Sequence, residues 1–249
     1  MYYCHFFLTY NSLLPILAPL EKDADSIFRE VKKIAVMLQL NSNLEDYYNS
    51  RVWMKTSFLG VPCLKAVTDM WNYQEIIYQL KPTLLIEFGT AAGGSTLFFD
   101  ELLKIIYHDQ SNKYHILTVD IDPTPIHQKI KNKPTIEILT TSSLNPLVKE
   151  KIIILKKLFP GPLFAILDSN HTKAHVFQEI VLMNEILNPG DYLIVEDTII
   201  NNPLPFDYEG PMEALKEYMN EYPQCFRLDK ERMEKFGLTF APLGYLVKV

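Results

Sequence analysis

Apolar residues beyond position 80 fall into short runs, and segments with helical periodicity separate these runs. Six or seven runs predict β-strands, the sixth being weaker; they span residues 83–89, 115–122, 135–141, 164–170, 191–198, 225–229 and 244–249. Several carry apolar residues at consecutive positions, which is typical of strands buried on both faces. The pattern therefore predicts a sheet covered by helices on either side.

The segments between these runs predict helices over residues 94–107, 145–159, 172–187 and 211–221. Strands that alternate with helices in this way are typical of parallel β-α-β units. We therefore expect an α/β fold with a mostly parallel, seven-stranded sheet. Upstream, residues 21–40 carry apolar side chains at helical spacing, and residues 68–80 form a second helical segment. These two segments predict a helical N-terminal extension over residues 1–80, ahead of an α/β domain over residues 81–249.

Acidic residues gather where the predicted strands end. They are Glu87, Asp120, Asp122, Asp168, Glu196 and Asp197. Ligands of open parallel sheets bind outside the carboxyl ends of the strands, close to the point where the strand order reverses. The sequence therefore predicts a binding site along this edge of the sheet.

The first predicted strand runs into a loop of small residues, Glu87-Phe88-Gly89-Thr90-Ala91-Ala92-Gly93-Gly94-Ser95, that opens a helix. Small residues allow a sharp turn and a close approach of a ligand to the backbone, and a helix start offers unpaired N–H groups. The spacing differs from the dinucleotide fingerprint G-x-G-x-x-G. It is similar to the E/D-x-G-x-x-x-G loop of class I methyltransferases, which bind S-adenosylmethionine.

Two further positions fit a nucleoside ligand. Asp120 ends the second strand, where a carboxylate can accept hydrogen bonds from a ribose diol, although a solvated turn residue is the simpler alternative. Ser142 and Ser143 follow the third strand, where an adenine edge would lie, but serines are common in loops.

Asp168, Glu196 and Asp197 end neighbouring strands, and three carboxylates that converge repel one another unless a cation lies among them. Oxygen ligands suit a hard ion such as Mg²⁺. Capping of the following helices is the simpler alternative. His171 lies three residues after Asp168, and we expect it to act as a base toward a hydroxyl whose pKa the cation lowers. A loop histidine that is merely exposed is the competing interpretation.

Composition narrows the function classes. The chain has 249 residues and a formal net charge of −6, which argues against nucleic acid as the main ligand, because phosphates need clustered Lys and Arg. Cys4, Cys63 and Cys225 show no paired spacing, so a reducing cytoplasm fits best. The apolar stretch 6–20 is interrupted by prolines, and we interpret it as oligomer-contact surface of a homo-oligomer, with no stable membrane insertion.

Five motifs in order resemble the cephalosporin hydroxylase-like group of S-adenosylmethionine-dependent methyltransferases, which includes rhamnosyl and macrolide-sugar O-methyltransferases. They are Tyr73-Gln74-Glu75-Ile76-Ile77, the 86–95 loop, Leu167-Asp168-Ser169-Asn170-His171-Thr172, Val195-Glu196-Asp197-Thr198 and Pro242-Leu243-Gly244-Tyr245-Leu246. The similarity runs from about residue 56 to the C-terminus. Where the group has a pattern like Lys-x-Pro-x-Asp, this chain has Lys65-Ala66-Val67-Thr68-Asp69.

The resemblance implies a Rossmann-like class I methyltransferase fold and a set of site residues. Those that would bind S-adenosylmethionine are Glu87, Gly89, Thr90, Gly93, Ser95, Asp120 and Ser143; Asp168, Glu196 and Asp197 would hold Mg²⁺, and His171 would be the catalytic base. The expected function is O-methylation of a hydroxyl on a sugar, glycan or secondary metabolite. An accessory, nonenzymatic nucleotide-binding protein and an NAD-dependent oxidoreductase are the alternatives.

Overall fold

The computed structural model describes residues 43–201, 204 and 207–249, and residues 44–249 form one compact unit. The helix predicted over residues 21–40 and the apolar stretch 6–20 lie outside the described residues, so the N-terminal extension stays a prediction. Residues 44–80 belong to the same compact unit as the sheet. The functional division at residue 80, with acceptor or subunit contacts assigned to residues 1–80, is not settled by this packing and also stays a prediction.

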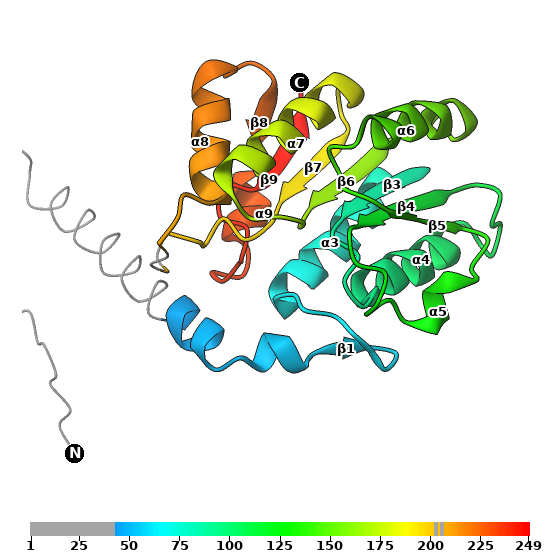
Figure 1. The fold of residues 1–249 in the computed structure, drawn as a ribbon, viewed down its shortest axis with the longest axis horizontal. Coiled ribbons are helices and arrows are strands. Elements are labelled where there is room, and N and C mark those ends of the chain that lie inside the picture. Colours follow the sequence, from blue (N-terminus) through cyan, green and yellow to red (C-terminus); the bar gives the residue numbers. More distant parts are fainter. Residues whose placement is uncertain (1–42, 202–203, 205–206) are drawn as a thin grey trace, which may run out of the picture. The chain divides into compact units, whose positions relative to one another are not determined.

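Seven strands form one sheet in the order β5-β4-β3-β6-β7-β9-β8 (Figure 1). The strands are β3 (Leu84–Phe88), β4 (His115–Asp120), β5 (Ile136–Thr140), β6 (Leu163–Leu167), β7 (Tyr192–Val195), β8 (Phe226–Leu228) and β9 (Tyr245–Lys248). The pairs β3·β4, β3·β6, β4·β5 and β6·β7 are parallel, whereas β9 runs antiparallel to both of its neighbours. The prediction of a mostly parallel, seven-stranded sheet is confirmed.

Helices cover both faces of this sheet (Figure 1). They are α3 (Val67–Leu80), α4 (Gly94–Ile106) and α5 (Gln128–Lys131), together with α6 (Pro146–Leu158), α7 (Lys173–Ile186), α8 (Pro211–Glu221) and α9 (Lys230–Glu234). All five residues of β3 and of β6 are buried, because alternate side chains enter different cores. Leu84 and Ile86 join one core with helices α6, α7 and α8, and Leu85 joins a second core with α3 and α4.

Strand order places the site. From β3 the strand order runs through β4 and β5 on one side and through β6 and β7 on the other, so it reverses at β3. Because β3 and β6 are parallel neighbours, their carboxyl ends lie side by side. Burial of each core aliphatic side chain contributes about 1.5–3 kcal/mol, which fixes these strand ends against each other. The acidic residues that follow β3, β6 and β7 are therefore held at one edge of a rigid sheet.

Several short elements were not predicted. They are the 3₁₀ helix η1 (Val52–Lys55), the hairpin of β1 (Ser57–Phe58) and β2 (Val61–Pro62), and the one-turn helices α5 and α9. Elements of two to five residues are too short to produce a hydrophobic period. Among the described residues no helix combines the length and the apolarity needed to span a membrane. A cytoplasmic location and a homo-oligomeric state stay predictions.

Candidate active site

A tight loop connects β3 to α4 and lies against the end of β6. Gly89 has a φ of +97°, and a Cβ atom at this position would lie 1.9 Å from the carbonyl oxygen of Asp168. Only glycine fits both the backbone conformation and the close approach. Gly93 has a φ of +85° and caps the N-terminus of α4. The two glycines let the loop bend over the strand ends.

Glu87 lies beneath this loop and is completely buried. Its Oε1 accepts a hydrogen bond from the hydroxyl of Ser95, and its Oε2 accepts bonds from Thr96 and, at 2.9 Å, from Thr118. Burial raises the pKa of Glu87, although the charge of Lys65 and the three hydroxyl groups oppose this effect. Both oxygens thus accept hydrogen bonds within the protein and hold the loop against β4, and binding of a cofactor by Glu87 stays a prediction.

The remaining residues predicted for the cofactor are well ordered by internal contacts. Asp120 accepts hydrogen bonds from the backbone N–H groups of Ala91 at 2.8 Å and Asp122 at 3.0 Å. The hydroxyls of Thr90 and Thr118 lie 2.6 Å apart. Ser143 is buried, with its hydroxyl 2.9 Å from Nε2 of a histidine on α7, His175. The bond from Ala91 to Asp120 therefore links the loop after β3 to the end of β4.

A small pocket opens over the glycine loop. It is lined by Pro62, Cys63, Leu64, Lys65, Gly89, Thr90, Ala91, Ala92, Gly94, Ser95 and Asp168. Of the predicted cofactor residues, Gly89, Thr90 and Ser95 line this pocket, whereas Glu87, Gly93, Asp120 and Ser143 do not. The segment 62–65, which covers the loop from the side of the β1–β2 hairpin, was missed by the sequence analysis.

Asp168, His171 and Asp197 meet beside this pocket. Nε2 of His171 lies 3.2 Å from Oδ1 of Asp168 and 3.4 Å from Oδ2 of Asp197. One ligand atom from each of the three residues lies within 4.8 Å of the others, a spacing that fits a single metal ion. Asp197 has a φ of +52°, a backbone conformation that is uncommon outside glycine and asparagine and that often marks a functional site.

The third predicted metal ligand, Glu196, stands apart from that group. Its Oε1 accepts hydrogen bonds from Lys65 at 2.9 Å and from the hydroxyl of Tyr73 at 2.7 Å. Among the described residues its Oε2 has no hydrogen-bond partner, so this oxygen is free to reach a cation. Lys65 bridges Glu196 to Asp168, and the role of Glu196 as a metal ligand stays a prediction.

Electrostatics at the cluster differ from one side chain to the next. Burial acts to lower the pKa of His171, but the hydrogen bond to Asp168 and the charge of Asp197 outweigh it and raise the pKa to about 9. Burial and the charge of Asp168 raise the pKa of Asp197 to about 7. Burial also acts to raise the pKa of Asp168, but the charge of Lys65 prevails and lowers it.

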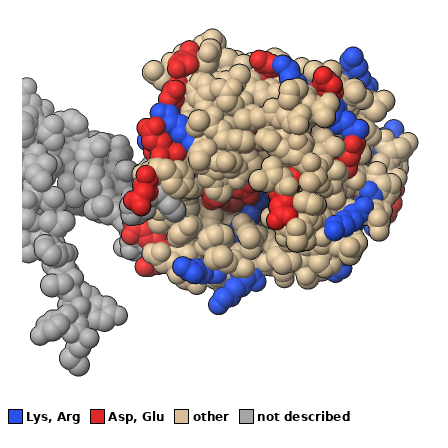
Figure 2. Space-filling model, in the orientation of Figure 1, with Lys and Arg blue, Asp and Glu red and all other residues tan. Residues whose placement is uncertain are grey.

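Lys65 is the main functional residue that the sequence analysis missed. Its Nζ bonds Oδ2 of Asp168 at 2.6 Å as well as Oε1 of Glu196, and the lysine is only 5% exposed. Figure 2 shows basic and acidic atoms together in a hollow near the centre of this face. The protein itself therefore supplies one positive charge to these acids, and a metal ion at the site stays a prediction.

Comparison with known proteins assigns the family. The sequence profile described as Rhamnosyl O-methyltransferase/CmcI matches residues 50–249. This chain belongs to that family. The match confirms the resemblance, and with it the prediction of an S-adenosylmethionine-dependent O-methyltransferase over the two alternatives.

Individual relatives support the assignment. The chain is 42% identical over 204 residues to the rhamnosyl O-methyltransferase of Mycobacterium tuberculosis (strain ATCC 25618 / H37Rv), covering 81% of this chain and 82% of that protein. It is 41% identical to the rhamnosyl O-methyltransferase of Mycobacterium leprae (strain TN), covering 87% of that protein. Among solved structures, an apo structure of CmcI-N160 has a TM-score of 0.63 at 21% identity and covers 79% of this chain and 77% of that one. This structural similarity confirms the Rossmann-like fold.

The segment from Lys65 to Asp69, where the resemblance predicted a Lys-x-Pro-x-Asp pattern, can now be placed. Lys65 bonds two site carboxylates, and Asp69 is completely buried, accepting hydrogen bonds from the hydroxyl of Tyr245 at 2.6 Å and from the backbone N–H of Phe240 at 2.8 Å. The absent proline therefore does not remove the contacts of either charged residue. The spacing of the two residues was the signal that could have identified Lys65.

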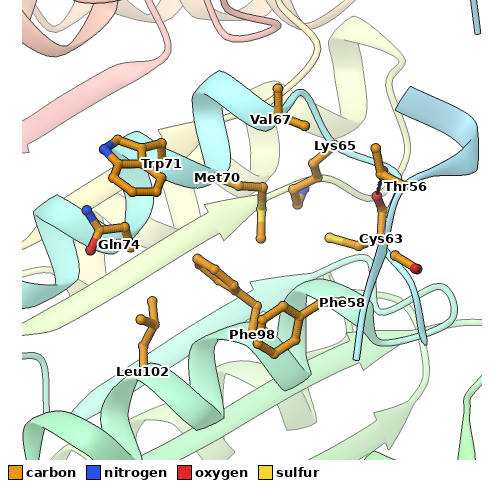
Figure 3. Close-up of a pocket in the computed structure, with 11 residues that line it drawn as sticks. Thr56, Phe58, Cys63, Lys65, Val67, Met70, Trp71, Gln74, Phe98 and Leu102 are labelled. Atoms are coloured by element: carbon orange, nitrogen blue, oxygen red, sulfur yellow. Dashed lines mark hydrogen bonds between the residues drawn. The ribbon is translucent and has the colours of Figure 1, made fainter. Parts of the chain in front are cut away.

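A second, larger cavity of about 350 Å³, which Lys65 also lines, lies between α3, α4 and the β1–β2 hairpin (Figure 3). Most of its lining is apolar, from Phe58, Val67, Met70, Trp71, Phe98 and Leu102. Lys65 and Cys63 line both this cavity and the small pocket over the glycine loop. The lysine therefore stands at the junction of two hollows and the acidic cluster.

Proposed function

We propose that this protein transfers the methyl group of S-adenosylmethionine to a hydroxyl group of a sugar, with Mg²⁺ bound by Asp168, Glu196 and Asp197. The observation that carries the proposal is the position of Asp168. Its side chain lies with those of Asp197 and His171 in the group whose ligand atoms fit a metal ion, and the same residue lines the pocket over the glycine loop. Lys65 joins Asp168 to the remaining carboxylate, Glu196. A cation bound there would adjoin the methyl donor.

The names of similar proteins support the donor, the metal and the acceptor. The relatives at 41–42% identity are named for a rhamnosyl acceptor. A solved structure with a TM-score of 0.58 and 19% identity is titled as a CmcI-D160 complex with Mg and S-adenosylmethionine. The ligand atoms of this chain fit the same chemistry, because carboxylate oxygens are the preferred ligands of Mg²⁺.

In the proposed reaction the glycine loop and Asp120 orient the donor, and Asp168, Glu196 and Asp197 would hold the cation beside the acceptor hydroxyl. A divalent cation would supply the positive charge that lowers the pKa of that hydroxyl. His171 takes the hydroxyl proton at Nε2, and the oxygen forms a bond to the methyl carbon as the bond from carbon to sulfur breaks. Much of the rate gain would come from this positioning, because a sulfonium methyl group is already activated.

His171 is poised for this task only when the charges around it change. Its raised pKa keeps a proton on the ring near neutral pH while Asp168 and Asp197 face it alone. A cation held by those carboxylates would weaken the interactions that raise the pKa of His171, and the ring could then accept a proton.

The test is a methyl-transfer assay with S-adenosylmethionine, Mg²⁺ and a rhamnosyl glycoside, with the methylated sugar detected by mass spectrometry. His171→Ala should lower kcat by roughly 10²–10⁴-fold, the usual contribution of a general base, with cofactor affinity unchanged. His108→Asn, on a surface turn, is the matched control and should keep full activity. Methylation of other hydroxyl compounds but no sugar would overturn the acceptor class. Full activity in excess EDTA would overturn the role of the metal.

A further inference from the structure

Lys65 has an unusual position for a lysine. It lies just before α3, it is 5% exposed, and its Nζ is shared between one oxygen of Asp168 and one oxygen of Glu196. A buried ammonium group is strongly disfavoured unless it is paired, and here two carboxylates from the ends of β6 and β7 pair it. The lysine is therefore an integral part of the cluster, because it neutralises charge on two of its acids.

The contacts of Lys65 divide the oxygens of the cluster into two sets. Oδ2 of Asp168 and Oε1 of Glu196 are bound to the lysine, and Tyr73 also donates to the latter. Oδ1 of Asp168 and Oδ2 of Asp197 face His171 instead. An incoming cation would thus meet a cluster in which one positive charge is already fixed on the opposite side of Asp168.

We propose that Lys65 is a positioning residue that serves as the fixed counter-cation of the divalent-cation site: it orients Asp168 and Glu196 and limits how tightly the divalent cation binds. The inference rests on the proposed function for the existence of that cation site. A cation that binds less tightly to its carboxylates retains more of its charge for the acceptor hydroxyl. Removing Lys65 should therefore strengthen cation binding and slow the methyl transfer.

These opposite signs distinguish a counter-cation from a residue that merely packs. If Lys65 served only to hold Asp168 and Glu196 in place, its loss would disorder them, and both cation affinity and kcat would fall. Loss of a fixed positive charge a few ångströms from the cation site would instead raise the affinity, since charges at this distance interact strongly in a partly buried site. The affinity of the cation alone, measured without turnover, separates the two.

The experiment measures binding of Mn²⁺ to the full-length protein by electron paramagnetic resonance of free Mn²⁺, in the absence of cofactor. Lys65→Met should bind Mn²⁺ about tenfold more tightly than the unmodified protein, and Lys65→Arg should stay within about threefold of it. The matched control is Lys133→Met. Lys133 also bridges two acids, Asp100 and Glu101, but none of these three residues belongs to the acidic cluster at the ends of β6 and β7. It should leave Mn²⁺ affinity unchanged.

A second variant keeps the inference testable if Lys65→Met folds poorly. Lys65→Gln removes the charge but retains a hydrogen-bond donor, and it should show the same gain in affinity. Equal or weaker Mn²⁺ binding by these two variants would overturn the inference while leaving the cation site itself intact. Absence of Mn²⁺ binding to the unmodified protein would overturn both the inference and the metal in the proposed function. For the variants that bind more tightly, a lower kcat is the expected companion result, and an unchanged or higher kcat would also contradict the inference.

Discussion

Two carboxylate sites lie at the same edge of the sheet, and they are stabilised in different ways. At the end of β3, Glu87 is completely buried and its hydrogen-bond donors are the neutral hydroxyls of Ser95, Thr96 and Thr118. At the ends of β6 and β7, the acids are paired with charged or chargeable groups, Lys65 and His171.

The difference indicates what each site can do. Neutral donors built into β4 and the first turn of α4 hold Glu87 in one place. Cationic partners can be exchanged for another cation of similar position, because the carboxylates are partly exposed: the side chains of Asp168 and Asp197 are 22% and 27% exposed. The first site is therefore a structural support of the loop, and the second is where chemistry can occur.

The largest effect is expected where the two sites touch. Gly89→Ala would place a methyl group 1.9 Å from the carbonyl oxygen of Asp168, so β3 and β6 must separate at their ends. We expect a loss of about 4 kcal/mol or more in the free energy of unfolding, since a steric clash adds to the strain of a positive φ. Urea denaturation followed by circular dichroism measures this loss.

Gly190→Ala provides the control. Gly190 has nearly the same φ, +92°, but nothing lies within 4 Å of a Cβ atom placed there. This variant should lose only about 1–2 kcal/mol, the cost of the left-handed conformation. Equal losses in the two variants would show that the contact between the glycine loop and β6 is not the cause.

Replacing one acid from each site should show how the two sites differ in their contributions to stability and in their response to Mg²⁺. Glu87→Ala leaves three buried hydroxyls without their acceptor and opens a cavity, so we expect a loss of about 3 kcal/mol in the free energy of unfolding. The loss should be the same in EDTA and in excess Mg²⁺. Differential scanning calorimetry in both buffers tests the expectation.

Asp197→Ala should behave in the opposite manner. Its side chain is partly exposed, and burial together with the charge of Asp168 disfavours its ionised form. We expect the stability in EDTA to change by less than about 1 kcal/mol, whereas the stabilisation by Mg²⁺ disappears. A large loss in EDTA would place Asp197 with Glu87 among the structural acids.

The sheet and the places of its acids could be predicted from the sequence, because consecutive apolar residues mark strands buried on both faces and polar residues mark the strand ends. The internal contacts of Glu87 could not be predicted from the loop motif. Alternation along β3 turns its side chain toward the first turn of α4, where Ser95 and Thr96 bond it, and its contact with a cofactor stays a prediction.

The contacts of Lys65 with Asp168 and Glu196 could not be predicted, because these partners are remote in the chain. Lys65 is 103 residues from Asp168 and 131 from Glu196 in the sequence, and local periodicity cannot indicate contacts between residues so far apart in the chain. The same holds for Tyr73, which lies 123 residues from Glu196. Sequence reasoning placed acids that share one edge of a parallel sheet, but it could not place a cation that reaches them from a helix start outside the strand series.

A pH dependence of stability is expected to be smaller than the losses at Gly89 and Glu87, and only the charged site should show it. In cation-free protein the pKa of His171 is about 9 in the folded state, against an ordinary value of 6.5. A raised folded-state pKa means that the folded protein binds the proton more tightly. The stabilisation is therefore fully present below pH 6.5 and is lost as the pH rises through 9.

We expect the free energy of unfolding in EDTA to fall by up to about 2 kcal/mol between pH 6.5 and 9, less than the full shift implies, because the ring is partly exposed and coupled to Asp197. His171→Asn should flatten the profile in this range, whereas His108→Asn should keep the slope. A flat profile for the unmodified protein would mean that the imidazole does not carry its charge between Asp168 and Asp197. The distinction between neutral and cationic partners would then rest on Lys65 alone.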